Sequence, residues 1–250
     1  GMVSVIVDSF NLIIYIYKSN YIYYNYIMPY IITIEGNIGS GKSTFLTYLK
    51  EYIHKQTHTN HHIQFIQEPV DEWNEIKDST GESILEKFYT NQKEYAFSFQ
   101  IMAYITRLRK LIQAVELHPN DIFICERSLE TDKYVFAKML YDNKKIREID
   151  WTIYNYWFNT FLEKNQTDLI IYIQTSPEIC HKRIDLRNRK GEENIPLDYL
   201  QMCHSYHEKW LETSNVKILT LDGAINKEHT VEYEALLHRM VNIIPQIFDS

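Results

Sequence analysis

Short apolar runs alternate with amphipathic stretches along most of the chain. Runs rich in Ile, Val, Tyr and Phe predict five β-strands, at Tyr30–Glu35, His62–Gln67, Asp121–Cys125, Leu169–Gln174 and Val216–Leu221. Between them, apolar residues recur at helical spacing, most regularly from Gln92 to Glu116. Because strands that alternate with helices form parallel sheets with crossover helices, the pattern predicts an α/β domain.

The predicted helix Gln92–Glu116 also carries polar residues on a second face. Gln100, Tyr104 and Arg107 are four and then three residues apart, so their side chains project together. Such a face lines a pocket or faces solvent. Position alone favours the solvated face by about two to one.

A glycine-rich segment lies between the first predicted strand and the next helix. Gly36–Ser43 matches the phosphate-loop pattern G-x-x-x-x-G-K-[ST]. Glycines permit tight turns whose N–H groups point at phosphate oxygens, and the helix N-terminus adds partial positive charge. Lys42 can reach the β- and γ-phosphates, and the Ser43 hydroxyl can bind Mg²⁺. We expect the loop contacts to come from Gly36, Asn37, Ile38, Gly39, Ser40, Gly41, Lys42, Ser43 and Thr44.

This loop indicates only that a nucleoside triphosphate binds, because GTPases, motor ATPases and small-molecule kinases share it. Composition narrows the class. A length of 250 residues suits one domain, and a net charge of −7 argues against nucleic acid as the main partner. The cysteines, Cys125, Cys180 and Cys203, lack paired spacing, which predicts reduced thiols and no zinc site.

The first 28 residues differ from the rest of the chain. Their apolar run, 3–17, is interrupted by Asp8 and Asn11 and is too short to span a membrane. It lacks the features of a secretory signal, and its lack of arginine disfavours a transit peptide. We therefore predict an N-terminal extension at 1–28 and one domain at 29–250. Either Met28 is the functional start, or the extension adds a strand or an arm to the domain. We expect a cytoplasmic protein, in the host cytoplasm if the source is a virus, with no membrane partner.

Charged residues follow the second and third predicted strands, at the sheet edge where open α/β sheets bind ligands. Glu68 could accept the proton of an attacking hydroxyl, although seen alone it would more often be an exposed glutamate at a strand end. Glu126 could bind Mg²⁺, and Arg127 could contact the transferring phosphoryl group or the acceptor oxygen.

Arginines gather after the fourth predicted strand. Arg183 and Arg187 share a helical face, and Arg189 follows. Such a cluster fits a lid that neutralises charge in the transition state; the alternative is a solvated basic helix.

Several ordered motifs extend this interpretation. They are IEGNIGSGKST, EPVxxW, FSFQ…RLR, ERSxxTDxYVFA, R-x-x-x-R-x-R, IPLDYL…HEKWL and LTLD. In this order, over residues 29–248, the chain resembles the deoxynucleoside kinase family, which includes deoxycytidine, deoxyguanosine and mitochondrial thymidine kinases and insect and viral relatives. The resemblance implies a P-loop NTPase-type three-layer fold, with a five-stranded parallel sheet flanked by helices and an arginine-rich lid. It also implies transfer of the γ-phosphate of ATP, or another NTP, with Mg²⁺ to the 5′-hydroxyl of a deoxynucleoside.

The resemblance also implies roles for single residues. Catalysis would use Glu68 as general base with Arg127 beside it, and Ser43 and Glu126 would form the magnesium pair. Gln100 would bind the base edge. The residues implied to contact the deoxynucleoside are Ile38, Glu68, Trp73, Phe88, Tyr89, Phe99, Gln100, Arg107, Arg127, Asp132, Phe136 and Glu192.

Within this set, the resemblance assigns Phe99 and Phe136 to the two faces of the base and Tyr89 to the 3′-hydroxyl. A glutamate after the lid would assist Tyr89. Counting from the following Ile-Pro favours Glu192, whereas counting from the lid arginines favours Glu193; we predict Glu192.

Substrate preference depends on Arg107 and Asp132. In the resembling family this pair is typical of the branch that accepts deoxycytidine and purines. Asp132 can accept hydrogen bonds from an exocyclic amine but would face the O4 acceptor of thymine unfavourably. We therefore predict deoxycytidine, deoxyadenosine or deoxyguanosine over thymidine.

Two other functions compete with this one: a nucleoside monophosphate kinase, such as a thymidylate kinase, and a non-catalytic nucleotide-binding protein. The resemblance further suggests a homodimer through the helices Gln92–Glu116 and Ile146–Lys164. Trp151, Tyr154 and Trp157 on the second helix could lie in that interface or equally in the core.

Overall fold

A computed structural model of the chain describes residues 29–56, 63–162, 165–189, 191–192, 195–225 and 231–239. The predicted extension 1–28 lies outside these ranges, so the division of the chain at Met28 stays a prediction. Among the described helices, none is both long and apolar enough to cross a membrane.

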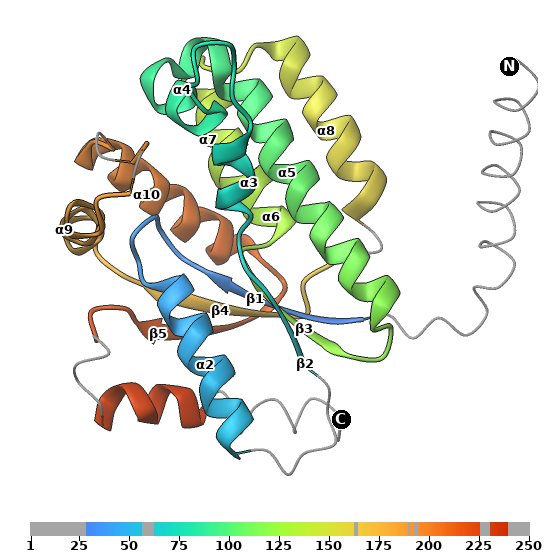
Figure 1. The fold of residues 1–250 in the computed structure, drawn as a ribbon, viewed down its shortest axis with the longest axis vertical. Coiled ribbons are helices and arrows are strands. Elements are labelled where there is room, and N and C mark those ends of the chain that lie inside the picture. The colour runs from blue at the N-terminus through green and yellow to red at the C-terminus, as the bar shows by residue number, and fades with distance from the viewer. Residues whose placement is uncertain are drawn as a thin grey trace, which may run out of the picture.

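Five parallel strands form the centre of the protein, in the order β2-β3-β1-β4-β5 (Figure 1). They are β1 (Tyr30–Glu35), β2 (Ile63–Ile66), β3 (Ile122–Glu126), β4 (Leu169–Gln174) and β5 (Lys217–Asp222). The predicted α/β fold with a five-stranded parallel sheet is confirmed. The strand bounds move slightly. Glu126 is the last residue of β3 and not part of the loop after it, because it pairs in register with Ile34 of β1.

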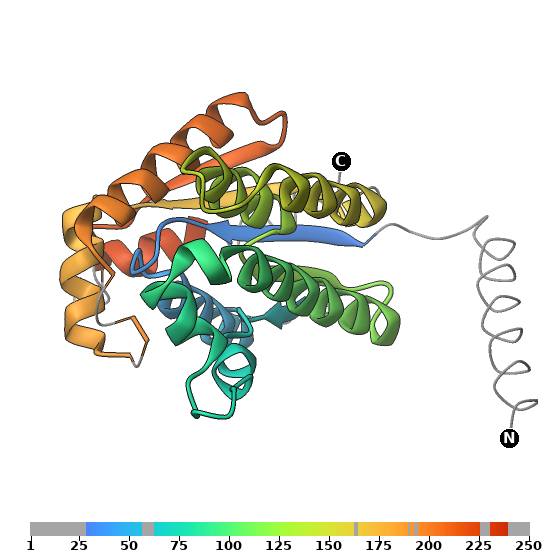
Figure 2. The same cartoon turned by 90° about the horizontal axis from the view of Figure 1, so that it is seen from above.

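Helices cover both sides of this sheet (Figure 2). They are α2 (Lys42–Gln56), α3 (Val70–Glu75), α4 (Ile84–Thr90), α5 (Gln92–Leu117), α6 (Leu129–Thr131), the π-helix η2 (Asp132–Ala137), α7 (Lys138–Asp142), α8 (Glu148–Leu162), α9 (Pro177–Arg187), α10 (Leu197–Thr213) and the helical residues 231–239. The long predicted helix is therefore present as α5.

The two faces of the sheet bury different residues, because side chains alternate along a strand. Ile32 and Ile34 of β1 pack in one cluster with apolar residues of α2. Ile31 belongs to another cluster, with Leu111 and Val115 of α5. Thr33 and Glu35 share the face of Ile31 by this alternation.

The sequence left open whether the aromatic residues of α8 lie in the core or in an interface, and they differ in their exposure. Tyr154 is 1% exposed and belongs to the core, whereas Trp157 is 43% exposed. Trp151 stacks between Tyr141 and Tyr154, with ring centroids 5.0 and 6.0 Å away. The helix therefore anchors itself with one face and exposes another.

Candidate active site

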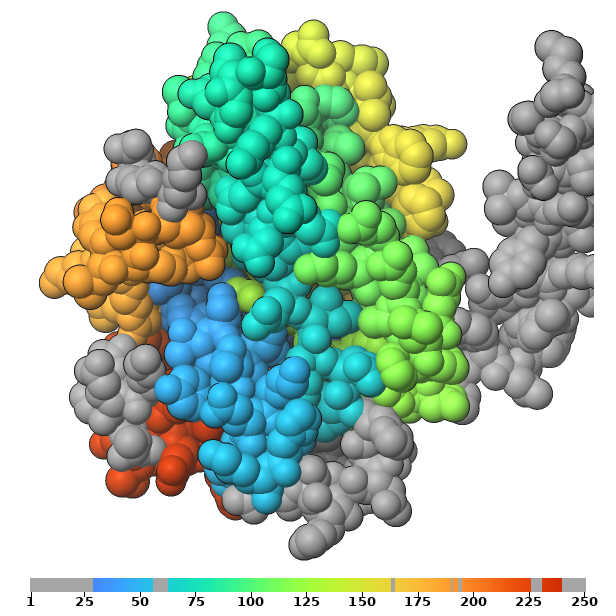
Figure 3. Space-filling view, viewed as in Figure 1, coloured from blue at the N-terminus to red at the C-terminus, as the bar shows by residue number. Residues whose placement is uncertain are grey.

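A cavity of about 880 Å³ lies at the carboxyl edge of the sheet. Figure 3 shows the surface hollowed where α9 (orange), the start of α2 (blue) and α3 (teal) meet. Every predicted site residue lines this cavity except Gly36 and Asn37. Parallel strands end at one edge, which is why residues from distant parts of the sequence converge there.

The phosphate loop connects β1 to α2, as its pattern predicts. Gly39 shows why glycine is needed: its φ is +78°, and an added Cβ would lie 2.6 Å from the carbonyl oxygen of Cys180. Gly36 is similarly confined, because its Cβ would lie 2.7 Å from the carbonyl oxygen of Ile173. Helix α9 and strand β4 therefore pack closely against the loop.

Asn37 attaches the phosphate loop to helix α10, on the side away from the cavity. Its amide Nδ2 donates to the carbonyl of Leu200 in α10 over 2.8 Å, and its Oδ1 accepts from the N–H of Ile38 over 2.9 Å. The side chain thus points away from the cavity, and a phosphate contact from Asn37 would have to come from its backbone.

Lys42 lies buried at the floor of the cavity, where its Nζ donates to the carbonyl of Asn37 over 2.7 Å. Burial, reinforced by the nearby charge of Arg127, lowers the pKa of Lys42 to about 8. A buried ammonium of this kind gains strongly from a negative phosphate, which restores its favoured charged form.

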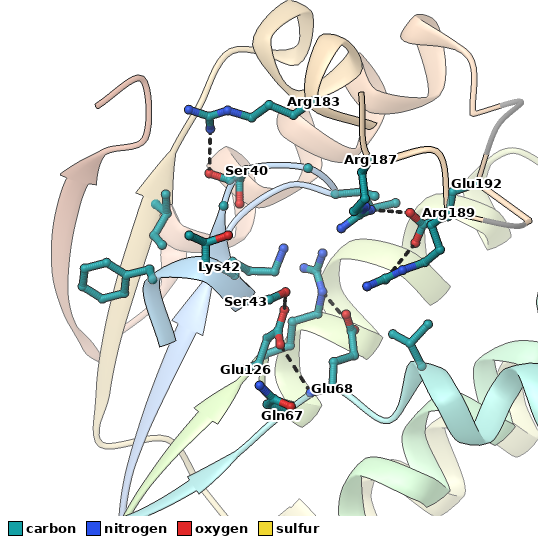
Figure 4. Close-up of a pocket in the computed structure, with 18 of the residues that line it drawn as sticks. Ser40, Lys42, Ser43, Gln67, Glu68, Glu126, Arg183, Arg187, Arg189 and Glu192 are labelled. Carbon is teal, nitrogen blue, oxygen red and sulfur yellow. Dashed lines mark hydrogen bonds and ion pairs between the residues drawn. The ribbon is translucent and has the colours of Figure 1, made fainter. Parts of the chain in front are cut away.

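Ser43 and Glu126 lie side by side, as expected of a magnesium pair. The Ser43 hydroxyl donates to Glu126 Oε1 over 2.5 Å (Figure 4). The other carboxylate oxygen, Oε2, lies 3.5 Å from the backbone N of Glu68. The arrangement presents hard oxygen donors next to the phosphate loop. Among the described residues, no cluster of three His, Cys, Asp or Glu side chains offers another metal site.

Glu68 is held by two arginines. Its Oε1 accepts from Arg107 Nη2 over 2.9 Å and lies 3.1 Å from Arg127 Nε. Burial opposes its ionisation, but the positive charges of Arg127, Arg107 and Lys42 outweigh burial and lower the pKa of Glu68 to about 2. The glutamate is therefore a site residue and not an exposed strand end.

Arg107 connects the carboxylates of Glu68 and Asp132 with the backbone carbonyl of Glu126. Its Nε and Nη2 donate to the two carboxylate oxygens of Asp132 over 2.9 and 3.2 Å, and its Nη1 donates to the carbonyl of Glu126 over 2.9 Å. It is 6% exposed and Gln100 is 3% exposed. Position alone favoured a solvated face for these residues, and that prediction is wrong, because α4, η2 and α8 cover this side of α5.

An aromatic compartment lies beyond Glu68. The rings of Phe88 and Phe99 stack with centroids 4.5 Å apart, and Trp73 meets Phe99 edge-on at 5.3 Å. Phe136 of η2 lies across the cavity, with the Arg127 guanidinium 4.9 Å from its ring centroid. Gln100 opens into this compartment, and its buried Oε1 has no hydrogen-bond partner among the described residues. An apolar slot with one unpaired amide oxygen suits a flat base that carries a hydrogen-bond donor.

The lid arginines have different partners. Arg187 and Arg189 both form ion pairs with the buried carboxylate of Glu192 (Figure 4). Arg183 instead donates to the carbonyls of Ser40 and Gly223 over 3.1 and 2.8 Å. Arg183 thus anchors the lid helix to the phosphate loop, and the arginines do not form one loose group. Glu193 lies outside the described residues.

Comparison with known proteins fits this geometry. The family model for deoxynucleoside kinase matches residues 32–245. The chain belongs to the deoxynucleoside kinase family. A probable deoxycytidine kinase of fowlpox virus (strain NVSL) is 36% identical over 200 residues, which cover 77% of this chain and 78% of the relative. Human deoxycytidine kinase is 33% identical over 84% of this chain and 88% of its own length. The mitochondrial deoxyguanosine kinase of Xenopus laevis is 31% identical over 75% of each chain.

This kinase also lines its cavity with residues that sequence reasoning missed. Tyr199 lies beside Tyr89, with ring centroids 6.3 Å apart, and burial, followed by the charge of Glu192, raises the pKa of Tyr89. At the opposite end, Gly223 and Tyr233 join the cavity. Tyr199 lies within the IPLDYL motif, which could have pointed to it. Tyr233 has no such signal, because only the packing of residues 231–239 on α2 brings it close.

Proposed function

We propose that this deoxynucleoside kinase transfers the γ-phosphate of ATP to the 5′-hydroxyl of a deoxynucleoside whose base carries an exocyclic amine. Deoxycytidine, deoxyadenosine and deoxyguanosine would be preferred to thymidine. The observation that carries the proposal is the buried Arg107–Asp132 pair beside Gln100 in the aromatic compartment. The names of the deoxycytidine and deoxyguanosine kinases among the relatives support it.

The acceptor half of the reaction would belong to Glu68. The 5′-oxygen bonds to the γ-phosphorus while the bond to the β,γ-bridging oxygen breaks, and the hydroxyl proton passes to the Glu68 carboxylate. A pKa of about 2 makes Glu68 a weak base. Proton transfer therefore belongs late in the reaction, after bond formation has acidified the hydroxyl, which suits a loose phosphoryl-transfer transition state. Until then the carboxylate orients the hydroxyl.

The donor half would belong to the phosphate loop and the arginines. Lys42 and the loop N–H groups would bind the β- and γ-phosphates, and Arg127 would stabilise charge on the transferring group. Arg187 and Arg189 would exchange some of their bonds to Glu192 for bonds to phosphate. Glu192, with Tyr89, would then be free to bind the 3′-hydroxyl.

Mg²⁺ fits the oxygen donors at this site. Ser43 and Glu126 would hold the ion, because magnesium is bound by one or two protein oxygens together with substrate phosphates. Bound there, it would neutralise phosphate charge. The protein's own contribution is to hold the two donors together, which the 2.5 Å contact between them already does.

Base selection would follow from the hydrogen-bond acceptors in the compartment, which are the unpaired Oε1 of Gln100 and the remaining lone pairs of the Asp132 carboxylate. An exocyclic amine can donate to Asp132, whereas the O4 of thymine would place an acceptor against a carboxylate. The Phe88–Phe99 stack narrows the same compartment, so the 5-methyl group of thymidine would also crowd it.

The test is a panel of the four deoxynucleosides with ATP on the wild type and on Arg107→Met/Asp132→Ala. We expect the ratio of kcat/KM for thymidine to that for deoxycytidine to rise by about ten- to a hundredfold in the variant. Absolute rates will fall for every substrate, because Arg107 also holds Glu68. Arg109→Met is the matched control, since Arg109 lies on the same helix but pairs with Glu72 on the surface. A wild type that prefers thymidine would contradict the proposal.

The same assay separates the competing monophosphate kinase. Deoxycytidine and deoxycytidine monophosphate are offered in parallel, and we expect turnover of the nucleoside only. A phosphate on the acceptor would approach the carboxylate of Glu68, and repulsion between the two charges disfavours it. Preferential use of the monophosphate would overturn the assignment.

We also propose a homodimer through α5 and α8, which lie side by side (Figures 1 and 2). Ile149, Ile153, Tyr156 and Trp157 are four, three and one residues apart and lie on one face of α8, all exposed. Ile105 of α5 is exposed as well. A second copy of the chain is the occupant that such an apolar helical face would bury.

A further inference from the structure

Glu35 is a buried carboxylate that the proposed mechanism does not use. It is the last residue of β1, directly before the phosphate loop, and it is 0% exposed. Its Oε2 accepts a short hydrogen bond from the hydroxyl of Thr131. Its Oε1 has no hydrogen-bond partner among the described residues. A buried acid is costly to keep, so its single hydrogen bond within the described residues calls for a role.

Thr131 lies at the end of α6 and is also 0% exposed. Its backbone N–H donates to the Ser128 hydroxyl oxygen over 3.0 Å, and the two hydroxyl oxygens are 3.2 Å apart. Each hydroxyl has one hydrogen. With the hydrogen of Thr131 donated to Glu35, Ser128 must donate to Thr131. The chain of bonds therefore runs in one direction, from Ser128 through Thr131 to Glu35.

The strained residue Arg127 lies directly before this chain. Its φ is +68°, in the left-handed region that non-glycine residues avoid. Its N–H donates to the carbonyl of Ile34 over 3.0 Å, and its Nη1 donates to the carbonyl of Gly36 over 2.8 Å. Such a conformation persists only where surrounding contacts enforce it. Glu35 lies between these two acceptors in the sequence, and its hydrogen bond from Thr131 reaches the segment four residues after Arg127.

Asp132 follows Thr131 immediately, as the first residue of η2. The bond from Thr131 to Glu35 thus ties the end of β1, which starts the phosphate loop, to a segment with Arg127 at one end and Asp132 at the other. This buried hydrogen bond therefore links the phosphate loop to Arg127, which would contact the phosphoryl group, and to Asp132, which would select the base.

We propose that Glu35 and Thr131 are positioning residues that hold Arg127 in its left-handed conformation and in line with Glu68. The inference rests on the proposed function, because it assigns Arg127 to the transferring group. Without the hydrogen bond between Thr131 and Glu35, the backbone at Arg127 leaves its left-handed conformation. The Arg127 guanidinium then moves away from Glu68. Phe99 and Gln100 lie on α5, and Asp132 keeps its two hydrogen bonds from Arg107 of the same helix. The base compartment therefore stays in place, and kcat falls more than KM.

The experiment compares Thr131→Val with Thr131→Ser. Valine keeps the shape and removes the hydroxyl, whereas serine keeps it. We expect Thr131→Val to lower kcat for deoxycytidine by about ten- to a hundredfold with a smaller change in KM, and Thr131→Ser to stay near wild type. Thr33→Val is the matched control. It removes a buried hydroxyl from the same strand face, and that hydroxyl has no hydrogen-bond partner among the described residues.

A second arm changes the acceptor. Glu35→Gln keeps an oxygen that can accept from Thr131 and should keep most of the rate, whereas Glu35→Leu should behave like Thr131→Val. This arm also decides the matter if Thr131→Val fails to fold. Equal losses in Glu35→Gln and Glu35→Leu, or a Thr131→Val enzyme with wild-type kcat, would overturn the positioning role.

A double-mutant cycle shows whether the connection acts through Arg127. In an Arg127→Ala background, Thr131→Val should cause no further loss of kcat. The same fold-loss in both backgrounds would mean that the role is merely structural. A wild type that phosphorylates none of deoxycytidine, deoxyadenosine and deoxyguanosine would instead refute the proposed function, so the two failures are distinct.

Discussion

At the scale of single residues, the site is an arrangement of opposite charges on side chains that are mostly buried. Glu68 lies against Arg107 and Arg127, and Lys42 lies below them. Each arginine also has a second partner, so removing one side chain leaves buried charges unpaired. Substitutions here should therefore change the rate more than their size suggests.

Glu68→Gln tests the general base. The amide keeps the shape and can still accept one hydrogen bond, but it cannot take the proton. We expect kcat to fall by about 10²- to 10⁴-fold, with a smaller change in the KM for deoxynucleoside. Glu72→Gln, which alters a partly exposed carboxylate on α3 that pairs with Arg109, should leave kcat unchanged. Turnover that survives Glu68→Gln would show that the base is misassigned.

Lys42 predicts a pH dependence. Its pKa is lowered to about 8, so the free enzyme keeps the ammonium below pH 8 and loses it above. Because kcat/KM for ATP reports the free enzyme, it should decline above about pH 8. The corresponding decline of kcat should occur at higher pH, since bound phosphates stabilise the Lys42 ammonium. Lys42→Arg should remove the alkaline limb from kcat/KM, whatever its effect on the maximum; an unchanged limb would assign it to another group.

At the scale of elements, the site depends on where helices start and strands stop. β1 and β3 end side by side, which places the phosphate loop next to Glu126. Helix α4 presents Phe88 and Tyr89 to the cavity and is only seven residues long. Such a short helix needs its cap, because few of its backbone groups find partners within it.

Ser83→Ala tests that cap. Ser83 accepts from the Glu86 N–H over 3.2 Å, and Glu86 Oε2 accepts from the Ser83 N–H over 2.8 Å. Loss of the hydroxyl should lower the free energy of unfolding by about 1 kcal/mol, measured by urea denaturation. Ser83→Thr keeps the hydroxyl and is the control. If alanine and threonine have equal stability, the capping box contributes nothing.

At the scale of the whole molecule, one cavity joins the proposed donor and acceptor halves of the reaction. The lid helix α9 closes one side, and α3, α4 and α5 supply the other. The exposed side of α8 lies away from this cavity, since none of its residues line it. A dimer through that face would leave each cavity complete.

Ile149→Glu/Tyr156→Glu tests the dimer. The two side chains are 61% and 75% exposed, so the change adds charge to the apolar face without disturbing the core. Sedimentation should show a wild-type dimer and a monomeric variant. Val231→Glu places the same charge on an exposed residue of helix 231–239 and should stay dimeric. A wild type that sediments as a monomer at micromolar concentration would contradict the interface.

The phosphate loop, the sheet and part of the site could be predicted from local patterns in the sequence. The glycine spacing of Gly36–Ser43 determines a phosphate loop, because backbone turns depend on neighbouring residues alone. The five apolar runs determined the parallel sheet, and the strand ends pointed to Glu68 and Glu126 since such ends share one edge. What Gln100 and Arg107 face was beyond this reasoning: periodicity says which residues share a helical face, not what covers it.

Only the tertiary structure decided the partners. Arg107 joins Glu68, 39 residues away, and Asp132, 25 residues away, in one buried network. Glu35 accepts a hydrogen bond from Thr131, which lies 96 residues away. These contacts depend on how twisted strands and packed helices bring distant segments together. Spacing along the chain does not contain that geometry. The charged residues of the site could therefore be identified from the sequence, but their pairing could not.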